Sequence, residues 1–569
     1  MSTRPLVPPP GAEEVLASPL DRHFAKLMVE LHGVDSAELE WAAQLVSAWR
    51  GLGHTCVPLP DVAPGSFVAG LRGSSVIGAP GEFAPLILDE GDRLYLHRYW
   101  SYEDALARAI KRRLETPADI DGALLHTGIT RFFGKADPAD DQRRAAERAV
   151  KANFSVITGG PGTGKTRTVV VLLALLIEQF SARGKTARIA LAAPTGKAGA
   201  RLKESLRTTG DALKLPAAIR DALPTEATTL HRLLGVRPHS PYFRHDAEHP
   251  LAVDIVIVDE ASMVDLALMA KLFAAVPPSA RLILLGDKDQ LASVEAGYVL
   301  GDICRASEEG DSQLAEHITE LRTNHRFAPD SGIYQLSQAV NAGDTRGALK
   351  LLSTEPGGDI IGTSLPAASG LGAALRERVL AGYSRYLDAA TPAEALTALN
   401  EFRILAALRK GPFGVENLNR LVEEILSEHG LIQPHSSFYH GRPVLIRENE
   451  PQLRLFNGDI GLLLRDPESG HELRAFFLDA EGTLRRLLPA RLPAHETGFA
   501  MTVHKSQGSE FRQVLFVLPE HEHAVCTREL LYTGLTRARD RVELWWREPA
   551  LRAAIERRTV RTSGLGSKM

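Results

Sequence analysis

The segment GGPGTGKT, residues 159–166, limits the possible folds of this chain more than any other stretch. It follows the short apolar run FSVIT (154–158) and precedes TRTVVVLLALLI, which has the composition of a buried helix. The segment fits the pattern G-x-x-x-x-G-K-[ST], in which glycines let backbone N–H groups turn toward a phosphate and the following helix adds partial positive charge. Such a loop between a strand and a helix indicates an α/β fold.

Each residue of this loop has an expected role at a nucleotide. Lys165 would reach the β- and γ-phosphate oxygens, and the Thr166 hydroxyl would be a ligand of Mg²⁺. Two partial copies, ARGKTAR (182–188) and PTGKAG (194–199), lack the first glycine or the Ser/Thr. We therefore expect one site for ATP and Mg²⁺, at the first segment. The other residues expected to surround the nucleotide there are Gly159, Gly160, Pro161, Gly162, Thr163, Gly164 and Arg167.

Acidic and amide side chains follow two other apolar runs. VDEAS (258–262) ends the run DIVIV, which makes Asp259 a candidate Mg²⁺ ligand and Glu260 a candidate to orient or deprotonate the attacking water. The alternative is that both acids cap a following helix. In LLGDKDQL (284–291), Gln290 could contact the γ-phosphate and Asp287 could brace the loop, although this short pattern is weak evidence by itself.

The pattern of apolar and polar residues along the chain predicts several structural regions. Apolar runs at 154–158, 188–194, 254–260 and 281–287 alternate with helical segments, which is typical of a parallel sheet covered on both faces. Before them, helical spacing over 18–33, 36–50 and 101–115 predicts a mainly helical front block. A second α/β region is expected from about 320. Within it, residues of roughly 436–492 form short strands with glycine turns, which predicts a small antiparallel barrel.

Composition sets broad limits. The net charge of −4 gives no bulk attraction to nucleic acid, although it allows a local basic channel. The longest apolar run (169–177) is too short to cross a bilayer, and MSTRPLVPPPGAEE has no apolar signal-peptide core. Cys56, Cys304 and Cys526 form no CxxC pair and are expected to be reduced thiols. We therefore expect a cytoplasmic protein without a membrane segment.

The order of the motifs resembles that of a known family. Gln142 precedes the phosphate loop, and APTGKAGARL (193–202), TTLHRLL (228–234), ELRTNHRF (320–327), MTVHKSQGSEF (501–511) and LLYTGLTRARDRVEL (530–544) follow it. This series resembles the superfamily 1 DNA helicases of the 5′→3′ branch. Within that branch the chain is similar, over almost its whole length, to the RecD family, the alpha subunits of the RecBCD exonuclease (exodeoxyribonuclease V).

The resemblance implies an architecture. It implies an α/β fold with two RecA-like P-loop motor domains, a helical N-terminal domain and a small SH3-like β-barrel insertion. The expected boundaries are 1–115 for the helical docking domain, 116–319 for motor domain 1A, 320–435 and 496–569 for the two parts of motor domain 2A, and 436–495 for the inserted barrel, 2B.

The resemblance also implies roles for matching residues. Gln142 would read adenine, Gln290 would couple to the γ-phosphate, and Arg326 and Arg537 would be arginine fingers. Gln507, Gly508 and Glu510 would face the interdomain cleft. The fingers are chosen by motif match over the neighbours Arg322, Arg539 and Arg541. The implied DNA contacts, each of which could equally be a helix-capping or turn residue, are Thr195, Lys197, Thr228, His231, Thr502, His504 and Ser506.

The implied activity is ATP-dependent 5′→3′ movement on DNA. The chain would be the motor subunit of a heterotrimer with RecB-like and RecC-like subunits, acting on single-stranded tails and duplex ends in recombinational repair. Two alternatives stay open: an assembly subunit whose ATP site is a switch, and a stand-alone 5′→3′ helicase. The front block has no helix-hairpin-helix extension, which favours the subunit. No Asp/Glu/Lys cluster of a nuclease is evident, so nuclease activity is expected only from the assembled complex.

Overall fold

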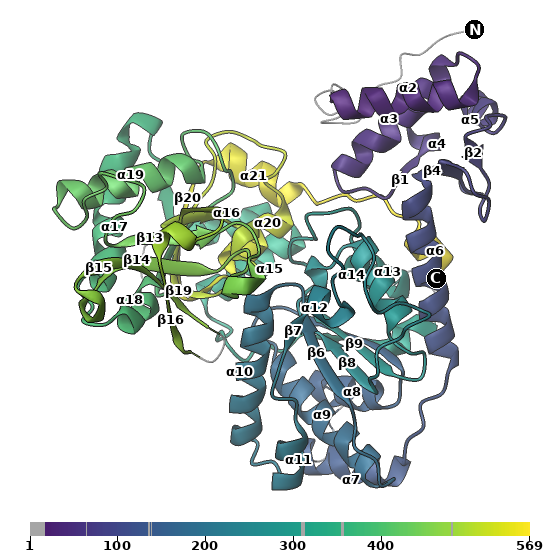
Figure 1. The fold of residues 1–569 in the computed structure, drawn as a ribbon, viewed down its shortest axis with the longest axis horizontal. Helices are drawn as coiled ribbons and strands as arrows, with labels where there is room; N and C mark the ends of the chain where they lie inside the picture. Colours follow the sequence, from purple (N-terminus) through teal and green to yellow (C-terminus); the bar gives the residue numbers. More distant parts are fainter. Residues whose placement is uncertain are drawn as a thin grey trace.

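The computed structural model describes residues 18–63, 65–134, 137, 139–308, 313–353, 358–479 and 482–569. The N-terminal stretch in which we expect no signal peptide lies outside these residues, as do residues 136 and 138 of a turn-rich break before the phosphate loop. Figure 1 shows a front block joined to two α/β bodies that lie side by side.

The front block contains the predicted helices and a sheet that was not predicted. Helices α2 (Pro19–His32), α3 (Ala37–Gly51) and α6 (His97–Glu115) confirm the three expected segments, and α4 (Leu59–Val62) and α5 (Gly65–Leu71) are short additions. The sheet has the order β1-β4-β3-β2, formed by Cys56–Pro58, Arg93–Leu96, Leu86–Leu88 and Ile77–Gly78. The expectation of a mainly helical block was therefore incomplete, because strands of two to four residues are too short to show a period.

The first body, here called the P-loop body, is built on a six-stranded sheet of order β10-β5-β9-β8-β6-β7 in which every pair is parallel. The four predicted strands are confirmed, since β5, β6, β8 and β9 lie at the expected apolar runs. The strands are β5 (Phe154–Gly159), β6 (Ile189–Ala193), β7 (Thr228–Thr229), β8 (Ile255–Val258), β9 (Arg281–Gly286) and β10 (Ile318–Leu321).

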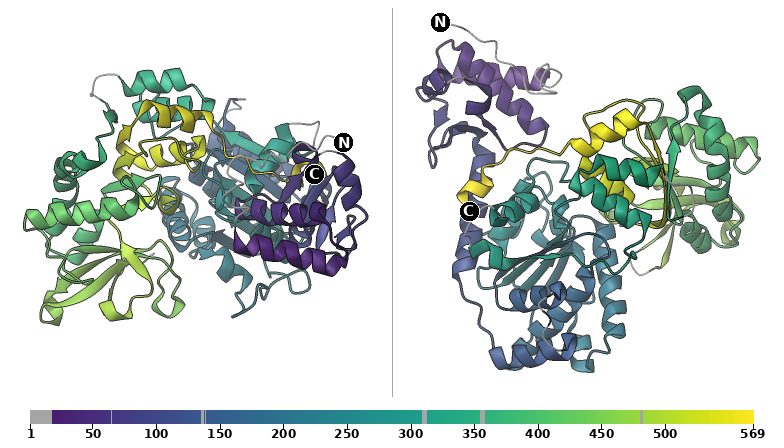
Figure 2. Two further views of the ribbon diagram at one scale, coloured as in Figure 1. Left: turned by 90° about the horizontal axis from the view of Figure 1, so that it is seen from above. Right: turned by 180° about the vertical axis from the view of Figure 1, so that it is seen from behind.

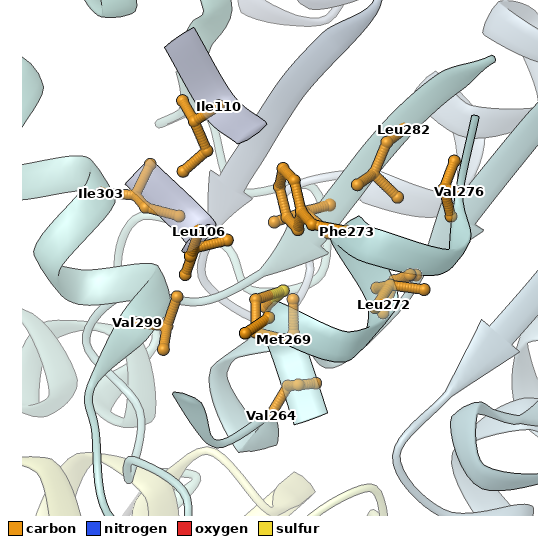
Figure 3. Packing of buried hydrophobic residues seen from close by; sticks show 14 of the residues in the cluster. Leu106, Ile110, Val264, Met269, Leu272, Phe273, Val276, Leu282, Val299 and Ile303 are labelled. Atoms are coloured by element: carbon orange, nitrogen blue, oxygen red, sulfur yellow. The ribbon is translucent and has the colours of Figure 1, made fainter. Parts of the chain in front are cut away.

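Helices cover both faces of this sheet. On one face, Leu106 and Ile110 of α6 pack with Met269 and Phe273 of α13 and with Ile303 of α14 (Figure 3). On the other face lies the almost wholly buried α9, next to α7, α8, α10 and α11. The helices are α7 (Gly122–Phe133), α8 (Asp141–Val150), α9 (Lys165–Ser181), α10 (Gly196–Ala212), α11 (Ala217–Ala222), α12 (Leu230–Leu234), α13 (Leu266–Ala275) and α14 (Val299–Glu308).

The second body, here called the C-terminal body, has a five-stranded parallel sheet of order β11-β20-β19-β12-β18. Its strands are β11 (Ile360–Ser364), β12 (Phe402–Ala406), β18 (Ala500–Thr502), β19 (Phe511–Val517) and β20 (Ala538–Trp546). Its helices are α15 (Gly332–Ala342), α16 (Thr345–Leu352), α17 (Leu371–Leu387), α18 (Pro392–Leu399), α19 (Val415–Glu428), α20 (Arg528–Leu535) and α21 (Glu548–Glu556).

A separate antiparallel sheet is inserted in the C-terminal body between β12 and β18. Its order is β16-β15-β14-β13-β17, formed by Leu484–Leu487, Glu472–Leu478, Ile460–Asp466, Arg442–Ile446 and His495–Thr497. It has a small core of its own that includes Val444, Leu463 and Phe477. At the Asn-Gly turn before β14, Gly458 adopts φ 95°, which glycine tolerates without strain. This sheet confirms the antiparallel strands predicted for this region.

The last residues of the chain return to the front block. After α21, residues 557–569, here called the C-terminal strap, run from the C-terminal body to α6 and end in α22 (Leu565–Lys568) (Figures 1 and 2). The backbone N–H of Thr55 donates to the carbonyl of Thr562 at 3.0 Å, and Leu565 is fully buried against α6 and α14. The strap therefore links the C-terminal body to both other parts of the molecule.

Candidate active site

A cavity of 360 Å³ lies where the P-loop body meets the C-terminal body. From the P-loop body it is lined by the loop from Pro161 to Thr166 and by Asp259, Glu260 and Gln290. From the other side Gly508, Glu510 and Arg537 reach it, and Arg326 lines it from the segment after β10. The structure thus brings most of the predicted nucleotide-binding residues to one place, although they come from segments far apart in the sequence.

The phosphate loop has the backbone that its glycines predict. Gly162 and Gly164 adopt φ 84° and 83°, and α9 begins at Lys165 directly after them. A Cβ on Gly162 would lie 2.4 Å from the Cβ of Arg326, so a larger residue there would push the Arg326 segment away. That segment also contacts the loop directly, since the N–H of His325 donates to the carbonyl of Gly162 at 2.8 Å.

The remaining loop candidates lie behind the cavity wall. The amino group of Lys165 donates to the carbonyls of Gly159 and Gly160, which do not line the cavity themselves. Gln142 is buried on α8, where its amide donates to the carbonyl of Thr163 at 3.2 Å and accepts from the Arg167 guanidinium at 2.6 Å. Gln142 and Arg167 therefore brace the loop in this structure, and contact of Gln142 with adenine stays a prediction.

The acidic pair follows β8. Glu260 adopts a left-handed φ of 52°, a conformation that costs roughly 1–3 kcal/mol and concentrates at functional sites. Burial and the negative charge of Glu260 raise the pKa of Asp259. Among the described residues neither carboxylate has an ion-pair partner. Two adjacent carboxylates that line the same cavity as Thr166 suit a divalent cation, so the donor set fits Mg²⁺.

Gln290 is held by Asp287. The Gln290 amide donates to Oδ2 of Asp287 at 2.9 Å, and the N–H of Asp289 donates to Oδ1 at 3.1 Å. Both Asp287 and Gln290 are buried, and Gln290 lines the cavity. The predicted bracing role of Asp287 therefore corresponds to a contact in the structure.

Four arginines surround the cavity, of which two were predicted. Arg537 is 2% exposed and donates to the carbonyls of Thr533 and Ser509, each at 3.1 Å. Arg326 donates to Glu510 at 2.8 Å, and Arg201 and Arg539 form ion pairs with the same carboxylate, also at 2.8 Å. Although burial alone would raise the pKa of Glu510, the charges of Arg201 and Arg326 hold it well below its usual range.

Arg201 was missed, and Arg539 was considered but passed over in favour of Arg537, because most surface arginines are solvated or make weak ion pairs. Arg201 lies within the motif APTGKAGARL, and Arg539 lies two residues after Arg537, so both positions were near a recognised signal. The sequence could not indicate that both of these guanidiniums, together with that of Arg326, pair with Glu510. This contact depends on how the two bodies meet.

Comparisons with family models and with known proteins bear on the identity of this arrangement. Residues 13–72 match the model "RecBCD enzyme subunit RecD, N-terminal domain", residues 142–296 match an AAA domain, and residues 497–544 match the UvrD-like helicase C-terminal domain. The chain is 41% identical to RecBCD enzyme subunit RecD of Mycolicibacterium smegmatis, over 97% of this chain and 98% of that protein. The chain belongs to the RecD family.

Other relatives agree with this assignment. RecBCD enzyme subunit RecD of Mycobacterium tuberculosis H37Rv is 43% identical over 92% of this chain and 88% of its own length. The ATP-dependent RecD2 DNA helicase of Deinococcus radiodurans is 32% identical over 79% of this chain and 54% of its own length. In the part of this RecD-family chain that the structure describes, no helix is long and apolar enough to cross a membrane.

Of the four predicted DNA contacts on the P-loop body, Thr195 lies on the loop after β6, and the other three lie in α10, β7 and α12. Thr195 caps α10, accepting from the N–H of Ala198 at 3.2 Å, and Lys197 follows it, with a pKa lowered to about 8 by burial and by the charges of Arg403 and Arg201. Thr228 forms part of β7, and His231 lies on α12, where burial lowers its pKa. These placements leave their DNA contacts as predictions.

The candidates from MTVHKSQGSEF differ in accessibility. Thr502 ends β18 and accepts from the N–H of Lys505 at 3.4 Å, and burial lowers the pKa of His504. Ser506 is fully buried and donates its hydroxyl to the carbonyl of Val503 at 2.7 Å. A direct DNA contact by Ser506 is therefore inconsistent with this structure, because the close packing before β19 leaves the side chain no exposed atom. Gln507 donates to the carbonyl of Leu291 at 3.0 Å across the two bodies.

Proposed function

We propose that this chain is the ATP-dependent 5′→3′ DNA motor subunit of a RecBCD-type helicase–nuclease that processes double-strand DNA ends. The observation that carries the proposal is the cavity itself. One wall supplies Lys165 and the acidic pair, and the other supplies Arg537 and Glu510. A nucleotide bound there would contact both bodies at once, which is what a motor driven by closing and opening of a cleft requires.

The residues divide the work of ATP hydrolysis between the two walls. Lys165 and the loop N–H groups bind the phosphates, and Glu260 orients the attacking water and takes its proton. Thr166 and Asp259 would hold Mg²⁺, which neutralises charge on the phosphate oxygens when it is bound. Arg326 and Arg537 stabilise the charge that develops during transfer, a contribution typically worth about 10³–10⁵ in turnover.

Single-stranded DNA would cross both bodies. Thr195, Lys197, Thr228 and His231 on the P-loop body, with Thr502 and His504 on the C-terminal body, would contact phosphates without reading sequence. The inserted sheet borders this path, since a Cβ on Gly196 would lie 3.2 Å from the ring of Phe456 before β14. We assign this sheet as an SH3-like barrel (2B, 436–495), flanked by motor domain 2A (320–435 and 496–569), with motor domain 1A at 116–319.

The front block (1–115) would dock the chain onto its partners in the cytoplasm. Leu20, Leu27 and Leu31 of α2 are 70%, 47% and 57% exposed, and their spacing places them on one face of the helix. An exposed apolar stripe of this kind marks an interaction surface, and the expected partners are RecB-like and RecC-like subunits. The stripe equally favours the second candidate, an assembly subunit whose ATP site acts as a switch.

The decisive test is Lys165→Gln in the complex assembled with its partner subunits. We expect loss of DNA-stimulated ATP hydrolysis by this subunit, and loss of unwinding from 5′-tailed duplexes when the other motor is inactive, with assembly intact. Lys185→Gln is the matched control, because Lys185 occupies the same position in the partial copy ARGKTAR and is exposed. Unchanged unwinding by Lys165→Gln would refute the motor and leave the assembly role.

A further inference from the structure

Tyr532 connects the C-terminal body to the ATP site of the P-loop body. It lies on α20, is 4% exposed, and donates its hydroxyl to Oδ2 of Asp287 at 3.0 Å. The same oxygen accepts from the amide of Gln290 at 2.9 Å. Gln290 therefore shares its anchoring carboxylate oxygen with a donor from the opposite body.

The Tyr532 hydroxyl also contacts the phosphate loop. A Cβ placed on Gly160 would lie 2.6 Å from Oη of Tyr532, so the glycine is needed for this close approach. The next residue, Thr533, accepts from the N–H of Leu291 at 3.0 Å, one residue beyond Gln290. These contacts form a buried seam between α20 and the loop after β9.

The same helix places an arginine finger. Arg537 lies two residues after the end of α20, and its guanidinium donates to the carbonyl of Thr533 at 3.1 Å. One short segment of the C-terminal body thus holds Arg537 on one side of the cavity and contacts Asp287, the anchor of Gln290, on the other. A shift of α20 would move Arg537 and would break the contact of Tyr532 with Asp287.

We propose that Tyr532 is a positioning residue for ATP hydrolysis, holding Asp287, and through it Gln290, in the orientation used when the two bodies are closed. This inference rests on the proposed ATPase function. Tyr532 touches no reacting atom; it supplies the second donor to a buried carboxylate only while α20 is seated. The orientation of the Gln290 side chain for ATP hydrolysis therefore depends on the position of the C-terminal body.

Electrostatics supports this geometry. Burial raises the pKa of Asp287, while the positive charge of Lys165 and the donors Gln290 and Tyr532 oppose the rise. The other charged groups acting on this carboxyl are Asp289 and Arg537. Removing the tyrosine hydroxyl should therefore raise the pKa of Asp287 further and weaken its hold on Gln290.

The test compares Tyr532→Phe with Tyr439→Phe in the full chain assembled with its partners. Tyr439 is the matched control, because it is also buried and donates to a carboxylate, Glu423 at 2.6 Å, but that carboxylate accepts from Thr497 and not from a residue that lines the cavity. We expect kcat of DNA-stimulated ATP hydrolysis to fall in Tyr532→Phe by about tenfold or more, as for a lost hydrogen bond to a charged group. The KM for ATP should change little, and the acid limb of the pH–rate profile should move to higher pH. Tyr439→Phe should leave all three unchanged.

A double-variant cycle examines the route through Asp287. In an Asp287→Asn background, Tyr532→Phe should cost less than about twofold, because the carboxylate it acts on is gone. Equal effects in both backgrounds, kcat as in the control, or loss of folding in Tyr532→Phe would each overturn the positioning role. Absence of ATPase activity in the wild-type complex would instead refute the proposed function, so the two failures are distinguishable.

Discussion

Replacing Lys568 by methionine should release the C-terminal strap from the front block. The amino group of Lys568 pairs at 2.8 Å with Oε2 of Glu103, a carboxylate on α6 that is 0% exposed. Three other donors reach Oε1: the hydroxyls of Thr55 and Ser563 at 2.5 and 2.9 Å, and the N–H of Gly564 at 3.2 Å. Lys568 is therefore the cation that compensates a buried negative charge.

The expected cost follows from that burial. Breaking a buried ion pair by removing one partner typically costs about 3–5 kcal/mol, because the other charge stays uncompensated. Since Oε1 keeps its three donors, we expect the low end, about 3 kcal/mol. That corresponds to an increase of roughly a hundredfold in the population of strap-released molecules.

Hydrogen exchange measures this population at named amides. The N–H groups of Thr55 and Gly564 are bonded across the strap contact, so they should exchange about a hundredfold faster in Lys568→Met. The double variant Glu103→Gln/Lys568→Met should recover most of the protection, because a neutral amide oxygen still accepts and no charge is left buried. Lys151→Met is the control, since Lys151 and Glu147 form an exposed pair worth little stability. If the single and double variants exchanged equally fast, the buried charge would not be what holds the strap.

Three further predictions concern pH and the cavity. Asp259→Asn should raise the melting temperature by about 3 °C near pH 7 while abolishing ATP hydrolysis: a carboxyl with a raised pKa binds its proton more tightly in the folded chain, so its ionisation lowers stability as pH rises above about 4. The pKa of His54 lies at about 4 because of burial and the charge of Arg561, so stability should fall as pH drops below about 6.5. His54→Asn can still accept from the N–H of Thr562, and it should reduce the fall in melting temperature measured as the pH drops below about 6.5. Glu510→Gln should lower the free energy of unfolding by about 2 kcal/mol, because Arg326 and two other arginines lose the carboxylate that they share. An unchanged midpoint of urea unfolding would contradict this prediction.

Local signals in the sequence were enough to predict the P-loop body. Its four main strands are continuous apolar runs because a parallel sheet is buried on both faces, and its phosphate loop is specified by glycines whose positive φ no other residue adopts easily. The acidic pair could be predicted for the same reason, since a polar residue directly after a buried strand lies at the edge of the sheet. The front-block sheet was missed because its strands are too short to carry a period.

The sequence by itself determined the phosphate loop, the parallel strands, the inserted antiparallel strands and the family, because each depends on residues that are neighbours along the chain. Only the tertiary structure decided that Glu510 holds three arginines, that Tyr532 reaches Asp287, that Ser506 is buried and that the last residues enclose Glu103. These contacts join residues far apart in the chain. These contacts form only when the separate bodies pack against one another, and no local pattern of side chains specifies that packing.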